Sequence, residues 1–124
     1  MENHVHINLP HHHGDEIDLS AIREQLDNIQ NFQILADIFK QLSDPTRIRI
    51  FWFLCHKEEC VIDIAFLMNM SSPAISHHLR ELKTSGLIIS RREGKEVYYK
   101  AAETTEAQML HHVIEDVMRI SCPS

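Results

Sequence analysis

Histidine and cysteine are the residues of this chain with the most distinctive chemistry. Of its 124 residues, ten are histidine and three are cysteine. Five of the histidines lie within the first 17 residues, where no helical or strand periodicity is visible: His4, His6, His11, His12 and His13. Because neutral imidazole is a common metal ligand, we expect residues 1–17 to form a flexible, histidine-rich arm that binds metal ions. A histidine-rich tail without a specific role is the alternative.

The three cysteines are Cys55, Cys60 and Cys122, an odd number without the spacing of a disulfide framework. We therefore expect free or metal-bound thiols. The chain has only three glycines and no glycine-rich nucleotide motif, which argues against a phosphate-binding loop. No nucleophile, base and orienting group form a recognisable set, so an enzyme is not expected.

Two adjacent helices with a short turn between them occupy the middle of the chain. An apolar helix is predicted over about residues 61–69, and a second helix is predicted to start at Ser72-Pro73 and to end at Gly86. Serine is a good N-cap, proline suits the first helical position, and glycine suits the position after the helix. Apolar residues at i, i+4 and i+7 of the second helix should face a core; they are Ile75, Leu79 and Leu82. This layout is that of a helix-turn-helix, whose second helix enters the major groove of DNA.

The opposite face of the second helix, and the segment after it, carry hydrogen-bonding and cationic groups. Two strands over about 87–92 and 95–100, turning at Glu93-Gly94, would make a basic wing. The candidate DNA contacts are Ser71, Ser72, Ser76, His77, His78, Arg80, Lys83, Arg91, Arg92 and Lys95. Of the two adjacent histidines, one is expected to touch DNA and the other to pack beneath it.

The distribution of charge is consistent with DNA binding. The whole chain has a net charge of −6, yet residues 72–100 carry six cations against three anions. A basic face on an acidic body suits binding to double-stranded DNA.

The length predicts one small domain that would gain from dimerisation. The absence of a long apolar run or signal peptide predicts a soluble, cytoplasmic protein.

Helices are also predicted on both sides of this region. Residues 18–43 should form one helix, capped by Asp18 or Ser20, with a long apolar stripe. Asp44-Pro45 should start a central helix whose apolar residues 48–54, Trp52 among them, are buried. A last helix should run from a cap at Thr104 or Thr105 to about Ile120. Residues 18–124 are thus predicted to be a mainly α-helical winged helix-turn-helix domain with a two-stranded wing. It would dimerise through its first and last helices, and two recognition helices about one DNA turn apart would read a palindrome.

Several stretches, in order, resemble a known family. They are Leu42-Ser43-Asp44-Pro45-Thr46-Arg47-Ile48-Arg49-Ile50, then Glu59-Cys60-Val61-Ile62-Asp63-Ile64-Ala65, then Ser76-His77-His78-Leu79, and the wing over 91–99. Together they cover about residues 30–120 and resemble the ArsR/SmtB family, bacterial winged-helix repressors that leave DNA when metal binds. The resemblance implies a homodimer that binds its operator in the metal-free state and loses affinity for it when a divalent metal binds.

Cys60 and Asp63 fall on the family's metal motif, Glu-Leu-Cys-Val-x-Asp-Leu, in which Glu59 stands in the leucine place. Residues i and i+3 at a helix start share a face, and the helix N-terminus favours a thiolate. Alternatively, Asp63 is a carboxylate that only complements the helix dipole, and Cys60 is only a small buried hydrophobic residue.

The resemblance also implies that ligands from the partner's N-terminal arm complete this site. His11, His12 and His13 lie about the right distance upstream. One cysteine, one aspartate and two histidines would suit tetrahedral zinc, with cobalt, cadmium or nickel as other candidate ions. Ile62 replaces the second cysteine of members with Cys-x-Cys, which argues against a thiolate-rich site.

The family's other metal site lies on the last helix, and here it is altered. Its positions hold Glu103, Thr105, Asp116 and Arg119, and threonine and arginine are poor zinc ligands. A rebuilt site could use His111, His112, Glu115, Asp116 and Cys122. Ordinary exposed side chains are the alternative there.

The sequence therefore predicts a zinc-responsive transcriptional repressor. A repressor of the same fold that responds to oxidation of Cys55, Cys60 or Cys122 is one alternative. A histidine-rich metal-buffering protein that binds no operator is the other.

Overall fold

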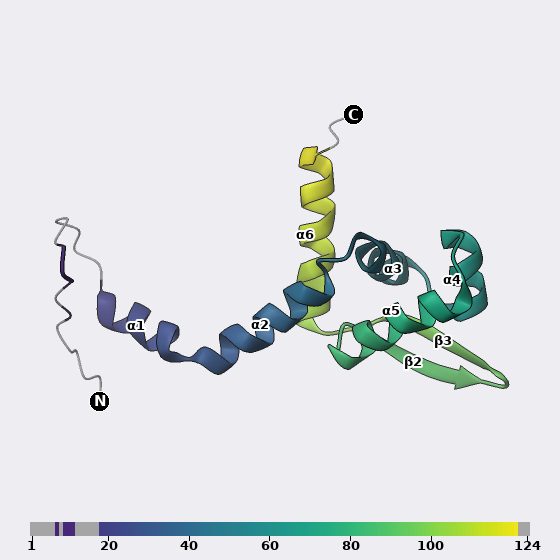
Figure 1. Ribbon diagram of the computed structural model, residues 1–124, viewed down its shortest axis with the longest axis horizontal. Coiled ribbons are helices and arrows are strands. Elements are labelled where there is room, and N and C mark those ends of the chain that lie inside the picture. Colours follow the sequence, from purple (N-terminus) through teal and green to yellow (C-terminus); the bar gives the residue numbers. More distant parts are fainter. Residues whose placement is uncertain (1–6, 8, 12–17, 122–124) are drawn as a thin grey trace. The chain divides into compact units, whose positions relative to one another are not determined.

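The computed structural model describes residues 7, 9–11 and 18–121, and the chain divides into two compact units, Met1–Ala36 and Asp37–Ser124. The described part is mainly helical, as predicted, with a small antiparallel sheet (Figure 1). The elements in chain order are α1 (Leu19–Asp27), α2 (Ile29–Gln41), α3 (Pro45–His56), β1 (Glu59–Cys60), α4 (Val61–Met68), α5 (Ser72–Thr84), β2 (Ile88–Glu93), β3 (Glu96–Ala101) and α6 (Thr105–Ser121). Within this part, no helix is both long and apolar enough to cross a membrane.

Two helices occupy the region where one was predicted. Asp18 caps α1 by accepting a hydrogen bond from the Ser20 amide at 3.1 Å. The prediction of a single helix over 18–43 was wrong, because the backbone leaves the helical region at Asn28, with φ −82° and ψ 71°. The Asn28 side chain then accepts a hydrogen bond from the Asn31 amide at 3.4 Å. Asparagine is a strong helix-capping residue, so it can end one helix and start the next while the apolar stripe continues.

The central helix α3 begins as predicted. The Asp44 carboxylate accepts a hydrogen bond from the Arg47 amide at 3.0 Å, and Pro45 occupies the first turn. Ile50, Phe51 and Leu54 of α3 are buried. Trp52, predicted to be buried, is only half-buried, although its indole nitrogen is shielded from solvent and has no hydrogen-bond partner among the described residues.

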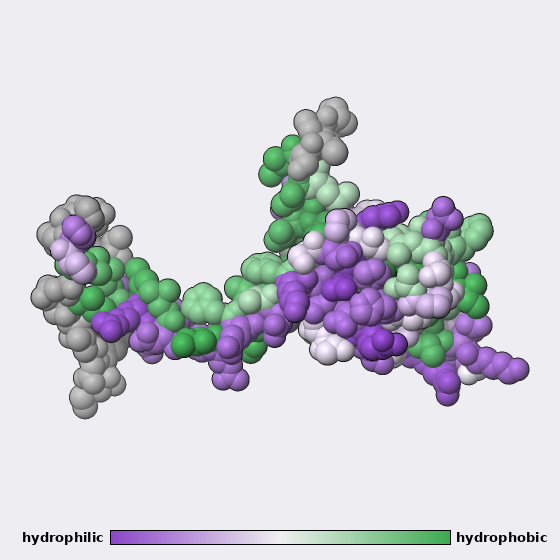
Figure 2. All heavy atoms as spheres, viewed as in Figure 1, coloured by the Kyte–Doolittle hydropathy of each residue, from purple (hydrophilic) through white to green (hydrophobic). Residues whose placement is uncertain are grey.

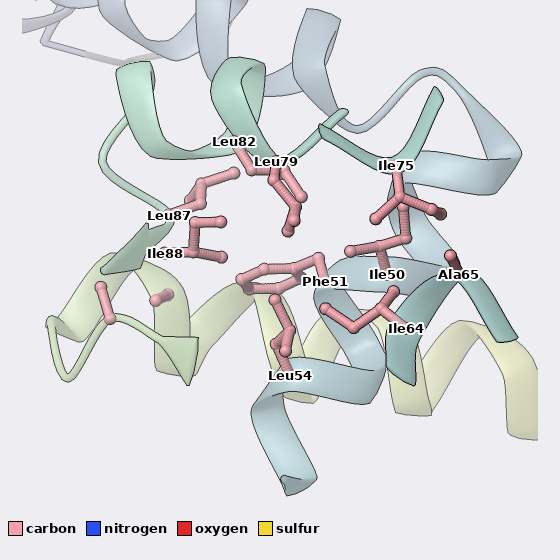
Figure 3. Packing of buried hydrophobic residues seen from close by; sticks show 12 residues of the cluster. Ile50, Phe51, Leu54, Ile64, Ala65, Ile75, Leu79, Leu82, Leu87 and Ile88 are labelled. Carbon is pink, nitrogen blue, oxygen red and sulfur yellow. The ribbon is translucent and has the colours of Figure 1, made fainter. Parts of the chain in front are cut away.

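The core joins α3 to the helix-turn-helix. Ile75, Leu79 and Leu82 of α5 are at most 1% exposed, which confirms the predicted inner face. They meet α3, Ile64 and Ala65 of α4, and Leu87 and Ile88 at the start of β2 (Figure 3). Complete burial of one such aliphatic side chain contributes about 1.5–3 kcal/mol, so this cluster fixes α5 on the rest of its unit.

The turn between α4 and α5 differs from the prediction by one residue. Asn69 ends α4 in the left-handed conformation, with φ 53°. Ser71, and not Ser72, is the N-cap of α5, since its hydroxyl accepts a hydrogen bond from the Ala74 amide at 3.3 Å. Gly86, with φ 81°, follows the C-cap of α5 as predicted.

The wing forms as predicted, but its sheet has a third strand. β2 and β3 pair antiparallel from Ile88↔Ala101 to Glu93↔Glu96, and Gly94 supplies the positive φ, 64°, that the turn requires. Glu59 and Cys60, for which no strand was predicted, form β1. This strand pairs with β3, so the strand order is β1-β3-β2.

Much apolar surface stays exposed on the helices at the two ends of the chain. No residue of α1 or α2 is buried. Figure 2 shows apolar side chains along these helices and along α6. The exposed apolar residues of α1 and α2 include Ile22, Leu26, Ile29, Phe32, Ile34, Leu35 and Phe39, and those of α6 are Met109, Val113, Val117, Met118 and Ile120. Patches of this extent are typical of interaction surfaces.

Candidate DNA interface and metal centre

The outer face of α5 presents polar and cationic groups. Ser71, His77, Arg80 and Lys83 are exposed, while Ser72, Ser76 and His78 are partly buried. The Lys83 ammonium donates a hydrogen bond to the Ser90 hydroxyl at 2.7 Å, which connects α5 to the wing. The helix therefore offers hydroxyls near its start and cations further along, the order in which base edges and phosphates are met.

The two histidines of α5 have different surroundings. His77 is exposed, whereas His78 accepts a hydrogen bond at Nδ1 from Arg47 Nε at 3.2 Å. Arg47 also donates from Nη1 to Gln41 Oε1 at 2.7 Å, so it connects the end of α2 and the start of α3 to α5. Burial lowers the pKa of His78 below its ordinary value, and nearby Arg47 and His77 act in the same direction, against Asp44. The hydrogen bond from Arg47 requires a neutral His78 ring, because Nδ1 can accept it only when that nitrogen carries no proton.

Of the predicted DNA contacts in the wing, Arg91 is held by carboxylates of the protein, whereas, among the described residues, Arg92 and Lys95 are not. Arg91 donates from Nε and Nη2 to Glu58 Oε1 at 2.9 and 2.7 Å and from Nη1 to Glu93 Oε2 at 2.7 Å. Its guanidinium also lies 5.0 Å from the centre of the Tyr98 ring. Arg92 and Lys95 are exposed, and their side chains have no hydrogen-bond partner within the described part of the chain. Arg91 must therefore exchange partners before it can bind a phosphate.

Three potential ligands meet where β1 runs into α4. The carboxylates of Glu59 and Asp63 and the thiol of Cys60 bring one ligand atom each within 4.8 Å of one another. Cys60 is 7% exposed and occupies the N-cap of α4 without making a capping hydrogen bond. Thiolate sulfur and carboxylate oxygen are both ligands that zinc accepts. The donor set therefore fits a divalent metal ion.

Glu59 is the member of this group that the sequence analysis missed as a ligand. It is 8% exposed, its carboxylate forms an ion pair with Lys57, and it accepts a hydrogen bond from the Cys60 amide at 3.2 Å. The Lys57 ammonium holds the pKa of Glu59 below its ordinary value. Its presence where the family motif has leucine was a signal for such a role.

The other predicted ligands of this site lie mostly outside the described residues. This applies to His12 and His13, while His11 is described and exposed. Cys122, which was assigned to the second predicted site, also lies outside the described residues.

A second group of ligand atoms lies between α3 and α6. His111 Nε2 is 2.7 Å from Glu115 Oε1 and 3.2 Å from Nε2 of His56, a residue that the sequence analysis did not consider. His112 and Asp116, the other predicted members, are exposed and are not part of this group; Asp116 lies 3.9 Å from Arg119.

Cys55 lies next to His56 but has a different chemical character. It is free and half-buried, and burial, with a smaller effect of Glu115, raises its pKa to about 11. Its thiol is therefore protonated near neutral pH.

A recognition helix that packs on α3 and α4 and is followed by a basic wing defines a winged helix-turn-helix DNA-binding regulator. Comparison with known proteins identifies the family. Residues 44–90 match the family described as "Bacterial regulatory protein, arsR family". The chain is 33% identical over 94 residues to a transcriptional repressor SmtB homolog from Synechocystis, covering 76% of this chain and 71% of the relative. It is 42% identical over 82 residues to a cadmium resistance transcriptional regulatory protein CadC homolog from Staphylococcus aureus, covering 65% and 68%.

A solved structure has the same fold. The solution structure of a homodimeric winged helix-turn-helix DNA-binding domain from Mycobacterium bovis superposes with a TM-score of 0.67 at 29% identity, covering 73% of this chain and 82% of that one. The chain belongs to the ArsR family of bacterial transcriptional regulators. This membership confirms the predicted family, fold and DNA-binding class, and it confirms that the chain is not an enzyme.

Proposed function

We propose that this protein is a metal-responsive transcriptional repressor. Its metal-free homodimer binds a palindromic operator, and a divalent ion, zinc in the first place, lowers that affinity. The observation that carries the proposal is the group formed by Glu59, Cys60 and Asp63, at the helix that directly precedes the recognition helix. The two relatives, a transcriptional repressor SmtB homolog and a cadmium resistance transcriptional regulatory protein CadC homolog, support it.

The proposed DNA contacts are the exposed or partly buried polar residues of α5 and the wing. Hydroxyl groups and His77 near the start of α5 would meet base edges, while Arg80, Lys83, Arg92 and Lys95 would bind phosphates. His78 supports the helix from beneath through Arg47. Since the chain as a whole is acidic, this basic surface also orients the protein on the duplex.

The proposed dimer uses the exposed apolar surfaces of α1, α2 and α6. Burial of these side chains against a second copy would remove apolar area from water, which is the main favourable term in protein association. The homodimeric state of the Mycobacterium bovis domain supports this assignment.

The proposed metal site combines residues of both protomers. Glu59, Cys60 and Asp63 would supply ligands from one protomer, and His11, His12 or His13 of the other arm would complete a tetrahedral set. When bound, the ion would supply positive charge that holds the N-terminal arm against the helix-turn-helix. Coupling free energies between two such sites are typically ~1–3 kcal/mol, and linkage requires operator DNA to weaken metal binding by the same factor.

Regulation through a thiol switch at Cys55 has less support. The raised pKa of Cys55 keeps the thiol protonated, and the thiolate is the form that reacts. The metal hypothesis and the thiol hypothesis also differ in which cysteine controls release of DNA.

The test is the operator affinity of the wild type, Cys60→Ser and Cys55→Ser, measured by fluorescence anisotropy with and without zinc. The operator is a palindrome from upstream of the protein's own gene. We expect zinc to release the wild type and Cys55→Ser, and to leave Cys60→Ser bound. If zinc releases Cys60→Ser as readily as the wild type, the sensing site lies elsewhere. If no variant responds to zinc while all bind DNA, zinc is not the inducer.

A further inference from the structure

We propose that His56, His111 and Glu115 form a second divalent metal site, contained within one protomer, which joins the end of α3 to the middle of α6. One ligand atom from each of the three side chains lies within 4.8 Å of the other two. The family's last-helix positions in this chain are Glu103, Thr105, Asp116 and Arg119, so none of the three residues belongs to that site.

The separation of the two imidazole nitrogens is close to that of two ligands on one metal ion. Zinc binds imidazole nitrogen at about 2.0–2.1 Å, so neighbouring ligands of a tetrahedral ion lie about 3.3–3.4 Å apart. His56 Nε2 and His111 Nε2 are 3.2 Å apart, and their rings meet edge to face at 88°. His111 and Glu115 are four residues apart on α6 and therefore share a helix face. The two nitrogens are already nearly at ligand spacing.

The hydrogen bonds among these three side chains cannot all form at the same time. A neutral imidazole nitrogen is either a donor or an acceptor. If His111 Nε2 donates to Glu115 at 2.7 Å, it has no lone pair to offer His56 Nε2, and a single N–H cannot point well at both atoms. A cation placed among the three atoms accepts a lone pair from each of them.

The surroundings hold the ligands in place and leave room for one more. The His56 ring packs against Trp52, with 4.5 Å between ring centroids. His56 is the last residue of α3, where the negative end of the helix dipole favours a cation. Both histidines line a pocket of about 300 Å³. Two histidines and one glutamate with a water in the fourth position is an established zinc ligand set.

The experiment measures metal binding without DNA, so its outcome does not depend on the proposed repressor function. Full-length protein carrying Cys60→Ser, which removes the thiol of the first site, is titrated with Co²⁺. Binding is followed by the visible absorption of tetrahedral cobalt and by the rise in Tm that a ligand of the native state produces. Into this background we introduce His111→Gln, Glu115→Gln or His56→Gln, with His112→Gln as the matched control because it removes the adjacent, exposed histidine.

We expect His112→Gln to bind cobalt as its parent does. His111→Gln should lose the cobalt spectrum, and Glu115→Gln and His56→Gln should weaken binding by at least about 10-fold. The N-terminal histidines are the same in all variants and contribute an equal background. If His111→Gln is folded and binds cobalt like His112→Gln, the proposal is wrong. If His111→Gln fails to fold, unchanged binding by both Glu115→Gln and His56→Gln overturns it.

Discussion

Glu59→Gln separates a metal ligand from a structural carboxylate at the head of α4. The Glu59 side chain is nearly buried, adjoins Cys60 and Asp63, and forms an ion pair with Lys57. Glutamine keeps the shape and one acceptor oxygen, which can still receive the Cys60 amide hydrogen bond. It removes the charge that a divalent ion would neutralise. We therefore expect weaker zinc binding with little change in the metal-free fold.

The size of the effect follows from the role of the residue. Loss of a residue that only supports a ligand typically lowers metal affinity 10–100-fold, and loss of a ligand should cost no less. We expect a loss of about 10–100-fold, or ~1.4–2.7 kcal/mol. The lower part of this range is favoured because zinc must displace the Lys57 ammonium from Glu59, so the gain from this carboxylate is partly offset.

The assay has two readouts. Zinc affinity is measured by competition with a chromophoric chelator, and the zinc concentration for half-release of operator is measured by anisotropy. Both quantities should shift by a similar factor, because linkage ties zinc binding to operator release. Metal-free operator affinity should stay within about two-fold of the wild type. Glu58→Gln is the control for the chelator readout alone, because it removes a neighbouring carboxylate that lies outside the candidate ligand group and contacts the wing instead. Wild-type zinc affinity in Glu59→Gln, or a loss of metal-free DNA binding, would refute the reasoning.

Two further predictions concern the wing and the recognition helix α5. Glu58→Gln should release Arg91 for contact with DNA and raise metal-free operator affinity roughly two- to five-fold per protomer, as expected for loss of a surface ion pair. Glu96→Gln makes the same charge change in the wing without touching Arg91, so an equal gain in both variants, measured by anisotropy, would contradict this account. The lowered pKa of His78 predicts a dependence of stability on pH. Because the unfolded chain binds a proton more readily, the free energy of unfolding should fall as pH drops below the ordinary histidine value of 6.5. Denaturant titrations at pH 7.5 and 5.5 should show a smaller fall in His78→Gln, and identical falls would exclude His78 as the source.

Features set by neighbouring residues were readable from the sequence. Asp44 and Pro45 begin α3 as predicted, because a side-chain cap and a fixed proline φ act within one turn. The inner face of α5 was also predicted, since its spacing alone defines it. The break at Asn28 was missed because the apolar stripe continues through it, although an asparagine cap was a readable local signal.

Features that depend on distant residues were not readable. The two-residue strand β1 exists because Glu59 and Cys60 pair with Tyr99 and Tyr98, which lie about 40 residues further along the chain. The second candidate metal site also depends on residues that are far apart in the sequence. His111 and Glu115 share a helix face that spacing alone reveals, whereas His56 joins them only through the packing of α3 against α6, 55 residues apart. No local pattern carries that information.

Strand β3 has a further consequence for the path that regulation takes through the protein. Tyr98 is opposite Cys60 on one edge of β3 and opposite Arg91 on the other, so a single residue of the wing lies between the candidate metal site and β2. A backbone shift at β1 must be followed by β3, or the bonds between them must break. In the proposed homodimer, such a shift would reach the wing of the same protomer through β3. A sensor built in this way would allow each half of a palindrome to be released separately, giving an intermediate that is bound to DNA through one protomer.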